Sequence, residues 1–254
     1  MAKISVVKTL IRLGYKGAFV VEVIWPKASE DESAKSSRRE LIGRMAIGVA
    51  HEIRNPLTVI KGYLQLQEKK STYCNGDSLR IIYQEIHQIE TVITSMLSLA
   101  QNKAINRIPE NLNHILAHLY PAVQQAAARN GIITELLLPE HLPRLALDAA
   151  EIGELVLHLA YNGIEAMQPE GRLTIGAEQT AGTVTLYVQD EGSGIPPEQR
   201  ERIFEPFYTT KSGNTGLGLA ISLSIVERHQ GKIEIVSGAG AGSVFKVMFP
   251  VLEQ

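Results

Sequence analysis

The most informative segment of the sequence is Ala50-His51-Glu52-Ile53-Arg54-Asn55-Pro56-Leu57. It sets one histidine beside one carboxylate inside a long segment of apolar periodicity. A neutral imidazole is a nucleophile, and an adjacent carboxylate can take the departing ring proton or hold the tautomer that exposes the attacking nitrogen. An isolated His-Glu pair is most often only a solvated helix face, so the role of His51 and Glu52 depends on the sequence around them.

Apolar residues recur around this stretch at alternating spacings of three and four, which is typical of a heptad seam. The seam positions are Ile42, Met45, Val49, Glu52, Pro56, Val59, Tyr63 and Leu66. His51 precedes a seam position by one residue, so we expect its ring to flank the interhelical groove and to stay accessible to a reaction partner. The pattern predicts one long helix from about residue 36 to residue 70.

A second segment with the same rhythm follows the polar loop 71–77. Its seam positions are Leu79, Ile82, Ile86, Ile89, Ile93, Met96 and Ala100. Two such helices predict an antiparallel hairpin over 36–105, and one hairpin has too little core to be stable alone. We therefore expect two hairpins to pair as a four-helix bundle in a homodimer. The alternative is that both stripes form the core of a monomer.

Composition and charge restrict the class of protein. The 254 residues include 44% apolar residues, with Lys+Arg 25 against Asp+Glu 27. Nearly balanced charge gives no indication of a nucleic-acid partner, and the length favours two domains. Cys74 is the single cysteine, which fits a reducing cytoplasm, and no Cys/His cluster has zinc-ligand spacing. Residues 1–35 are interpreted as an atypical N-terminal segment and linker, with an apolar run too short to span a membrane.

After Pro109 the heptads give way to mixed helices and strands, which predicts a boundary near Asn106 and a separate α/β domain over 106–254. The overall class is therefore α+β. Helices are expected at about 112–130, 149–167 and 221–229, and strands at 132–138, 172–178, 183–189, 232–236 and 244–249. Asp148 is expected to cap the second of these helices.

The segment Asp190-Glu191-Gly192-Ser193-Gly194 comes directly after a predicted strand. A carboxylate at a strand end suits an adenine pocket in which Asp190 accepts a hydrogen bond from the exocyclic amine. Gly192 and Gly194 would let a ligand approach the backbone. Alone, this pattern is a weak signal and usually marks a turn.

A glycine-rich run, Gly213-Asn214-Thr215-Gly216-Leu217-Gly218, opens the next predicted helix. Backbone N–H groups at such a helix start are a ready phosphate site, so Thr215, Gly216, Leu217 and Gly218 are candidate nucleotide ligands. The stretch 194–216 is expected to be a mobile lid that carries Lys211 near the terminal phosphate. The alternative for Lys211 is a solvated lid residue.

These segments, in this order, resemble the sensor histidine kinases of bacterial two-component systems. The run HEIRNPLTVIKGYLQL is most similar to the sporulation kinases of spore-forming bacilli, and the resemblance extends from about residue 37 to the C-terminus. It implies that ATP phosphorylates His51, with Glu52 as the acid/base partner. It also implies that Asn55 positions a water that dephosphorylates the partner, a response-regulator receiver domain in a phosphorelay.

The C-terminal segments resemble the ATP-binding domain shared by histidine kinases, gyrase-type ATPases, heat-shock protein 90 and MutL. The resemblance implies an α/β sandwich, ATP and Mg²⁺ as cofactors, and Asn162 as the magnesium ligand. The chain departs from the family's kinases at His158, where they usually have asparagine. Because imidazole is a poor magnesium ligand, a packing role and a functional role for His158 both stay open.

Relatives in this family usually carry membrane spans or sensor domains ahead of the acceptor helix, and none fits residues 1–35. We therefore expect a cytoplasmic catalytic core whose sensor or membrane module is supplied upstream or by another protein. Two other functions remain to be separated from the kinase. One is an ATP hydrolase of the same nucleotide fold, which leaves His51 unexplained, and the other is a catalytically silent dimeric scaffold.

Overall fold

The structure is a computed structural model that describes residues 4–5, 19–23, 49–50, 52–66, 76–100, 105–180, 182–211 and 214–252. The chain divides into two compact units. The α/β unit comprises residues 1–27, 104–205 and 218–254, and the helical unit comprises residues 28–103 and 206–217. His51, Cys74 and Gly213 lie outside the described residues, as do residues 36–48 and 67–70 of the first predicted helix.

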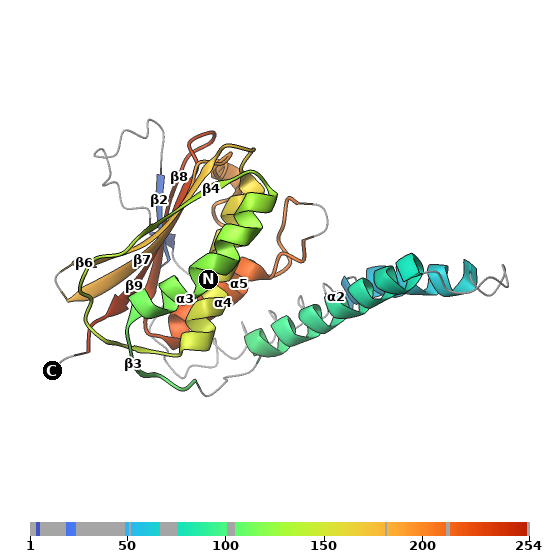
Figure 1. Cartoon of the computed structure of the whole chain (residues 1–254), viewed down its shortest axis with the longest axis horizontal. Coiled ribbons are helices and arrows are strands. Elements are labelled where there is room, and N and C mark those ends of the chain that lie inside the picture. The colour runs from blue at the N-terminus through green and yellow to red at the C-terminus, as the bar shows by residue number, and fades with distance from the viewer. Residues whose placement is uncertain are drawn as a thin grey trace. The chain divides into compact units, whose positions relative to one another are not determined.

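A seven-stranded sheet forms one layer of the α/β unit, in the order β1-β2-β8-β9-β7-β6-β4 (Figure 1). Strands β4 and β6 pair in parallel, and the other neighbours in the described sheet pair antiparallel. A separate two-stranded sheet is formed by β3 and β5. The strands are β1 (Ile4–Ser5), β2 (Phe19–Val23), β3 (Ile108–Glu110), β4 (Ile133–Leu137), β5 (Leu145–Leu147), β6 (Arg172–Thr180), β7 (Thr183–Asp190), β8 (Lys232–Ser237) and β9 (Ser243–Pro250).

Three helices, α3 (Leu112–Arg129), α4 (Ala149–Ala166) and α5 (Gly218–Arg228), lie over one face of this sheet (Figure 1). The side chain of Asp148 accepts hydrogen bonds from the backbone N–H groups of Ala150 and Glu151, so the predicted cap of α4 is confirmed. Between the layers, the register row Ile175, Val188, Phe245 and Ile235 is buried on four neighbouring strands. The expected α/β sandwich is therefore confirmed.

The predicted helices and strands of the α/β unit are observed with small shifts of their ends, and α5 begins earlier than expected, at Gly218. Strands β1, β2, β3 and β5 were not predicted from the sequence. Strand β2 lies within residues 1–35, which the pattern indicated to be a segment and linker, yet its backbone pairs with β8. The N-terminal segment thus contributes to the same sheet as the C-terminal half of the chain.

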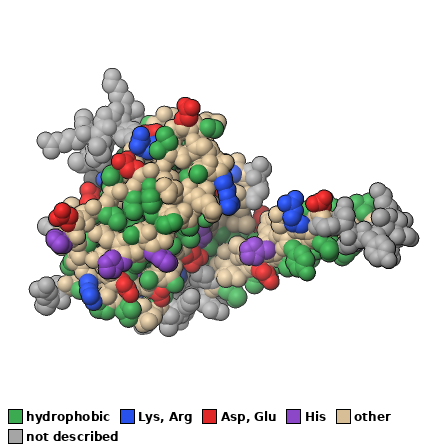
Figure 2. All heavy atoms as spheres, viewed as in Figure 1, with side chains coloured by type: hydrophobic (Ala, Val, Ile, Leu, Met, Phe, Trp, Pro, Cys, Tyr) green, Lys and Arg blue, Asp and Glu red, His purple; other side chains and the backbone are tan. Residues whose placement is uncertain are grey.

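In the helical unit, residues 49–50 and 52–66 and helix α2 (Gly76–Ala100) are helical, as the two heptad segments predict. Pro56 and Val92 are buried, but many large apolar side chains of the unit are exposed in the single chain, and Figure 2 shows apolar side chains on its surface. On α2 they recur at heptad spacing: Leu79, Tyr83, Ile86, Ile93 and Leu97. We call these five residues the α2 stripe. Among the described residues, no helix is both long enough and apolar enough to cross a membrane.

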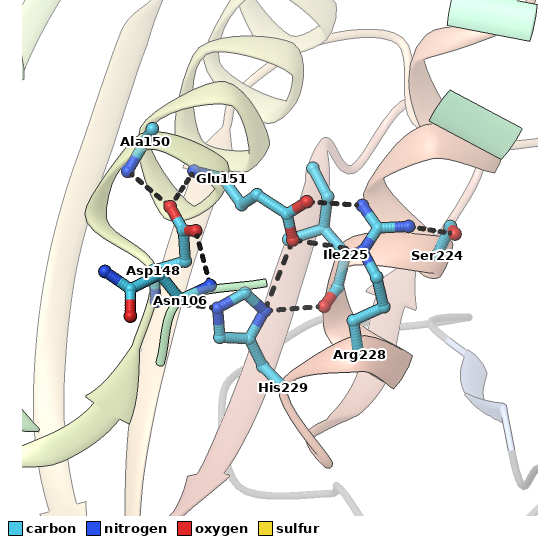
Figure 3. Close-up of polar contacts among 8 residues, drawn as sticks. All are labelled: Asn106, Asp148, Ala150, Glu151, Ser224, Ile225, Arg228 and His229. Atoms are coloured by element: carbon cyan, nitrogen blue, oxygen red, sulfur yellow. Dashed lines mark hydrogen bonds and ion pairs between the residues drawn. The ribbon is translucent and has the colours of Figure 1, made fainter. Parts of the chain in front are cut away.

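A buried polar cluster joins the first turn of α4 to the last turn of α5 (Figure 3). The guanidinium of Arg228 makes two contacts with the carboxylate of Glu151, at 3.0 and 3.1 Å. His229 accepts a hydrogen bond from the backbone N–H of Asp148 through Nε2, at 2.9 Å, and its Nδ1 lies 2.8 Å from the carbonyl oxygen of Ile225. These two contacts require a neutral ring with its proton on Nδ1.

The neutral ring makes the stability of the α/β unit depend on pH. Burial lowers the pKa of His229, so between its folded pKa and the usual value of about 6.5 the unfolded chain binds the proton more readily. The contribution of His229 is therefore present above pH ~6.5 and is lost as the pH falls below it. Urea unfolding followed by circular dichroism should show less acid destabilisation in His229→Gln than in the unmodified chain.

Comparing His229→Gln with the unmodified chain cancels the contributions of the other titratable groups to the pH dependence. Burial also lowers the pKa of His158, which acts in the same direction. Burial raises the pKa of Glu227 to about 7, and this favours the folded state in acid and so acts in the opposite direction. His87→Gln is the matched control, because His87 is on an exposed surface of α2. If the free energy of unfolding changes with pH in the same way in His229→Gln and in the unmodified chain, His229 is not a source of the acid destabilisation.

Candidate active site

The carboxylate of Asp190 lies at the end of β7 and is buried, with 4% of the residue exposed. Its Oδ1 accepts a hydrogen bond from the backbone N–H of Gly192 at 2.9 Å. A buried carboxylate must be held by hydrogen bonds to remain in an apolar setting, and the turn after β7 supplies one of them. The sequence-predicted position of Asp190 at a strand end is therefore observed.

Helix α4 approaches this strand end at Gly163, the residue after Asn162. A Cβ atom on Gly163 would lie 2.8 Å from Leu173 Cδ1 and 3.2 Å from Asp190 Cβ, so a larger residue here would force these side chains to shift. The contact brings the turn of α4 that carries Asn162 against the end of β7 that carries Asp190. Asn162 is partly buried there. The two residues that the sequence analysis assigned to magnesium and adenine thus come from adjoining elements.

The loop after Asp190 is held against a second glycine-rich loop, 238–242. Ile195 donates its N–H to Ser237 Oγ at 2.9 Å, and Gly242 donates its N–H to the carbonyl of Gly192 at 3.0 Å. Gly194 has φ +69, and a Cβ there would overlap the backbone of the second loop at Gly238. Gly194 is thus required by the folding of the loop itself, and a Cβ on Gly192 would lie only 2.6 Å from the carbonyl oxygen of Ala166. From the sequence, residues 238–242 were predicted only as a turn, although their repeated glycines were a signal for this close packing.

His158 faces the start of α5. A Cβ atom on Gly218 would lie 3.8 Å from both Cγ and Cδ2 of His158, so the imidazole stands over the first residue of that helix. His158 Nδ1 is buried and has no hydrogen-bond partner among the described residues. Burial lowers the pKa of His158, which keeps the ring neutral at pH 7. A neutral imidazole at the start of a helix can donate one hydrogen bond to an anion bound there.

The remaining predicted nucleotide residues lie in a different unit. Lys211, Thr215, Gly216 and Leu217 belong to the segment 206–217 of the helical unit. This segment closes on itself, because Phe207 donates its N–H to the carbonyl of Gly216 at 3.1 Å. Within it, Thr209 Oγ1 accepts from the N–H of Lys211 at 3.1 Å. The approach of Lys211 to a terminal phosphate stays a prediction.

The acceptor segment is described on both sides of His51, which itself lies outside the described residues. Residues 49–50 and 52–66 are helical, so the helix is present where the heptad pattern predicts it. Glu52 is partly buried and Asn55 is exposed. Their spacing of three residues puts them on one face of the helix, a turn apart. Their assigned roles stay predictions.

Two known protein families match consecutive parts of the chain. Residues 41–105 match the His Kinase A (phospho-acceptor) domain, and residues 147–253 match the family described as Histidine kinase-, DNA gyrase B-, and HSP90-like ATPase. Sporulation kinase C of Bacillus subtilis is 36% identical over 235 residues, which is 89% of this chain and 54% of that kinase. The chain thus spans about half the length of this curated relative.

Solved structures agree with these matches. The catalytic domain of histidine kinase ThkA is 31% identical with a TM-score of 0.53, and the alignment covers 57% of this chain and 96% of that domain. Histidine kinase ThkA in complex with response regulator protein TrrA has a TM-score of 0.71 at 26% identity, over 98% of this chain and 80% of that one. With a helical acceptor segment followed by an α/β sandwich, the chain belongs to the sensor histidine kinases of bacterial two-component systems.

Proposed function

We propose that the chain is a kinase core that transfers the γ-phosphoryl group of ATP to His51, and then to an aspartate of a response-regulator receiver domain. The observation that carries the proposal is the buried carboxylate of Asp190, held against the turn of α4 that bears Asn162. The relationship to sporulation kinase C supports a role in a sporulation phosphorelay. A particular likeness to sporulation kinase B, suggested by the acceptor run, stays a prediction.

The residues of the α/β unit fit a magnesium nucleotide. Asp190 accepts a hydrogen bond from the exocyclic amine of adenine, and the first N–H groups of α5 bind phosphate oxygens. Asn162 supplies the side-chain oxygen that Mg²⁺ prefers, whereas the neutral ring of His158 donates from its buried nitrogen to a phosphate oxygen. When bound, Mg²⁺ neutralises charge on the transferring phosphoryl group. Asn162 is therefore the protein ligand of the metal in this proposal.

The transfer step requires the neutral ring of His51. A ring nitrogen forms the new N–P bond, the bond from the γ-phosphorus to the bridging oxygen breaks, and ADP leaves while Glu52 takes the ring proton. The receiver aspartate then attacks the phosphorus and the N–P bond breaks. Asn55, one turn along the helix, positions the water that later hydrolyses the partner's phosphoaspartate. In this proposal the core acts in the cytoplasm.

Incubation with γ-labelled ATP tests the proposal against its two rivals. A histidine kinase produces label on the protein that is labile in acid and stable in alkali. An ATP hydrolase releases free phosphate without labelling the protein, and a silent scaffold does neither. Absence of protein label in the presence of Mg²⁺ and ATP would refute the kinase.

Asp190→Asn is expected to weaken binding of a non-hydrolysable ATP analogue by about 10- to 100-fold. The amide presents its donor to the adenine amine and loses the charge-assisted acceptor, an interaction of roughly 1.5–3 kcal/mol. Isothermal titration measures the effect, and Glu178→Gln, an exposed carboxylate on β6, is the matched control. Equal affinity of the unmodified chain for adenine and guanine nucleotides would contradict the assignment of Asp190.

The exposed α2 stripe supports the predicted homodimer. Ile86 and Ile93 are 40% and 43% exposed in the single chain, so charges placed there should leave the hairpin folded and disrupt a bundle formed by two chains. Ile86→Asp with Ile93→Asp should sediment as a monomer where the unmodified chain sediments as a dimer. The control is Gln84→Asp with Thr94→Asp, at exposed polar positions outside the stripe. If the Ile86→Asp, Ile93→Asp variant still sediments as a dimer, the α2 stripe is not part of the dimer interface.

A further inference from the structure

Strand β2 is held on the edge of the α/β sheet by backbone pairing with β8. Five consecutive residues pair antiparallel, from Phe19 with Ser237 to Val23 with Ile233. In Figure 1 the two strands lie side by side, and β1 pairs in turn with the outer side of β2. Residues far apart in the sequence are therefore neighbours at this edge.

Without β2, strand β8 would be the last strand on this side of the sheet. Its other neighbour is β9, and the N–H and C=O groups on its outer side would lack strand partners. Such an edge accepts an extended segment through main-chain hydrogen bonds, which is the strand-addition mode of recognition. The apolar residues of β8 are buried, including Ile233 and Ile235 at 1% and 0% exposure. The edge of β8 is therefore a docking surface, and residues 19–23 are its occupant.

Docking of β2 connects both ends of the acceptor hairpin to the same unit. Residues 1–27 belong to the α/β unit, residues 28–103 to the helical unit, and the chain returns to the α/β unit at residue 104. The acceptor hairpin is thus inserted between β2 and β3. Both of its ends connect to the same unit, so docking of β2 adds a second covalent tether between the hairpin and the nucleotide-binding residues.

The paired length makes β2 the weaker part of the sheet. It pairs with β8 over five residues, whereas β7 pairs with β9 over eight, and its outer neighbour β1 has two residues. Short edge elements open at lower free energy than the core of a sheet.

We propose that residues 19–23 are a releasable strand of the α/β unit, and that its docking restrains this unit and slows phosphorylation of the acceptor hairpin. Transfer requires the nucleotide-bearing unit to reach His51 and then to leave it free for the partner protein. A second tether limits this movement, because linked modules engage efficiently only when the geometry of both links permits it. The effect on rate rests on the proposed function, whereas the docking itself does not.

Docking is tested with a cysteine pair in the full chain. Glu22→Cys with Glu234→Cys, in a Cys74→Ser background, places two cysteines at directly opposite positions of antiparallel strands. Their Cα atoms are then roughly 4.5–5.5 Å apart, within the range of a disulfide. Mild oxidation should give an intrachain link between positions 22 and 234, seen by peptide mass analysis in a band of monomer size. A link between chains, or no link, would overturn the intramolecular docking.

The matched control is Glu22→Cys with Lys246→Cys in the same background. Lys246 pairs with Glu234 on the next strand, so it is two strands from Glu22, at roughly 10 Å, and should not form the link. The restraint of the α/β unit is then tested on the linked Glu22→Cys, Glu234→Cys protein, by measuring its initial rate of autophosphorylation before and after reduction of the disulfide. Reduction should raise the rate by about tenfold. Equal rates would overturn the restraint, and the Cys74→Ser chain controls for the reagents.

The two parts of the experiment separate this inference from the proposed function. If no form of the protein takes up phosphate, including the unmodified chain, the kinase proposal fails and the cross-link still decides the docking. If the unmodified chain is phosphorylated and no intrachain link forms, the docking fails and the kinase proposal stands.

Discussion

His51→Gln is expected to abolish phosphorylation of the protein while leaving ATP affinity nearly unchanged. Glutamine has no nucleophilic nitrogen to form the N–P bond, so no acceptor remains in the helix. Affinity should persist because Asn162, Asp190 and Gly218 belong to the α/β unit, whereas residue 51 belongs to the helical unit. Labelling with γ-labelled ATP and titration with a non-hydrolysable analogue measure the two quantities on one preparation.

His87→Gln is the matched control for this substitution. His87 is on α2 in the same unit, and its side chain is 82% exposed, so its loss removes a histidine without removing the acceptor. Its labelling should equal that of the unmodified chain. Substantial acid-labile label remaining on His51→Gln would show that another histidine accepts the phosphoryl group.

Glu52→Ala is expected to slow autophosphorylation by about 10²- to 10⁴-fold, which is the usual loss when a general base is removed. Glu52 is partly buried in a helix that continues from residue 52 to residue 66, so alanine should preserve both the helix and the dimer. ATP affinity should also persist, because Asn162, Asp190 and Gly218 lie in the α/β unit and not in the acceptor segment. Rapid-quench measurement of the single-turnover rate, with sedimentation of the same sample, checks both expectations.

The control for Glu52→Ala is Glu90→Ala on α2. Glu90 is 70% exposed, and its carboxylate lies 3.6 Å from Nδ1 of His87, a surface contact worth little in water. It removes one carboxylate from the same unit without touching the acceptor segment. If Glu52→Ala transfers phosphate at the normal rate, Glu52 is a seam residue of the bundle and the ring proton leaves by another route.

The local elements of the α/β unit could be predicted from the sequence because their signals are local. The Asp148 cap, the apolar periodicity of α3 and α4, and the alternation in β6 and β7 each depend on residues within a few positions of one another. The order of the chemical motifs was also visible, since the His51 segment, Asn162, Asp190 and the run before Gly218 follow one another along the chain. Family and fold class followed from that order.

Local patterns in the sequence were therefore enough to predict the acceptor helix, the sandwich and the candidate ligands. Three features became visible only in the folded chain: β2 pairs with β8, His158 stands over the start of α5, and α4 approaches Asp190 at Gly163. Strand pairing and close backbone approach join residues far apart in the chain. Side-chain periodicity indicates which face of an element is buried, but it carries no information on which distant element covers that face.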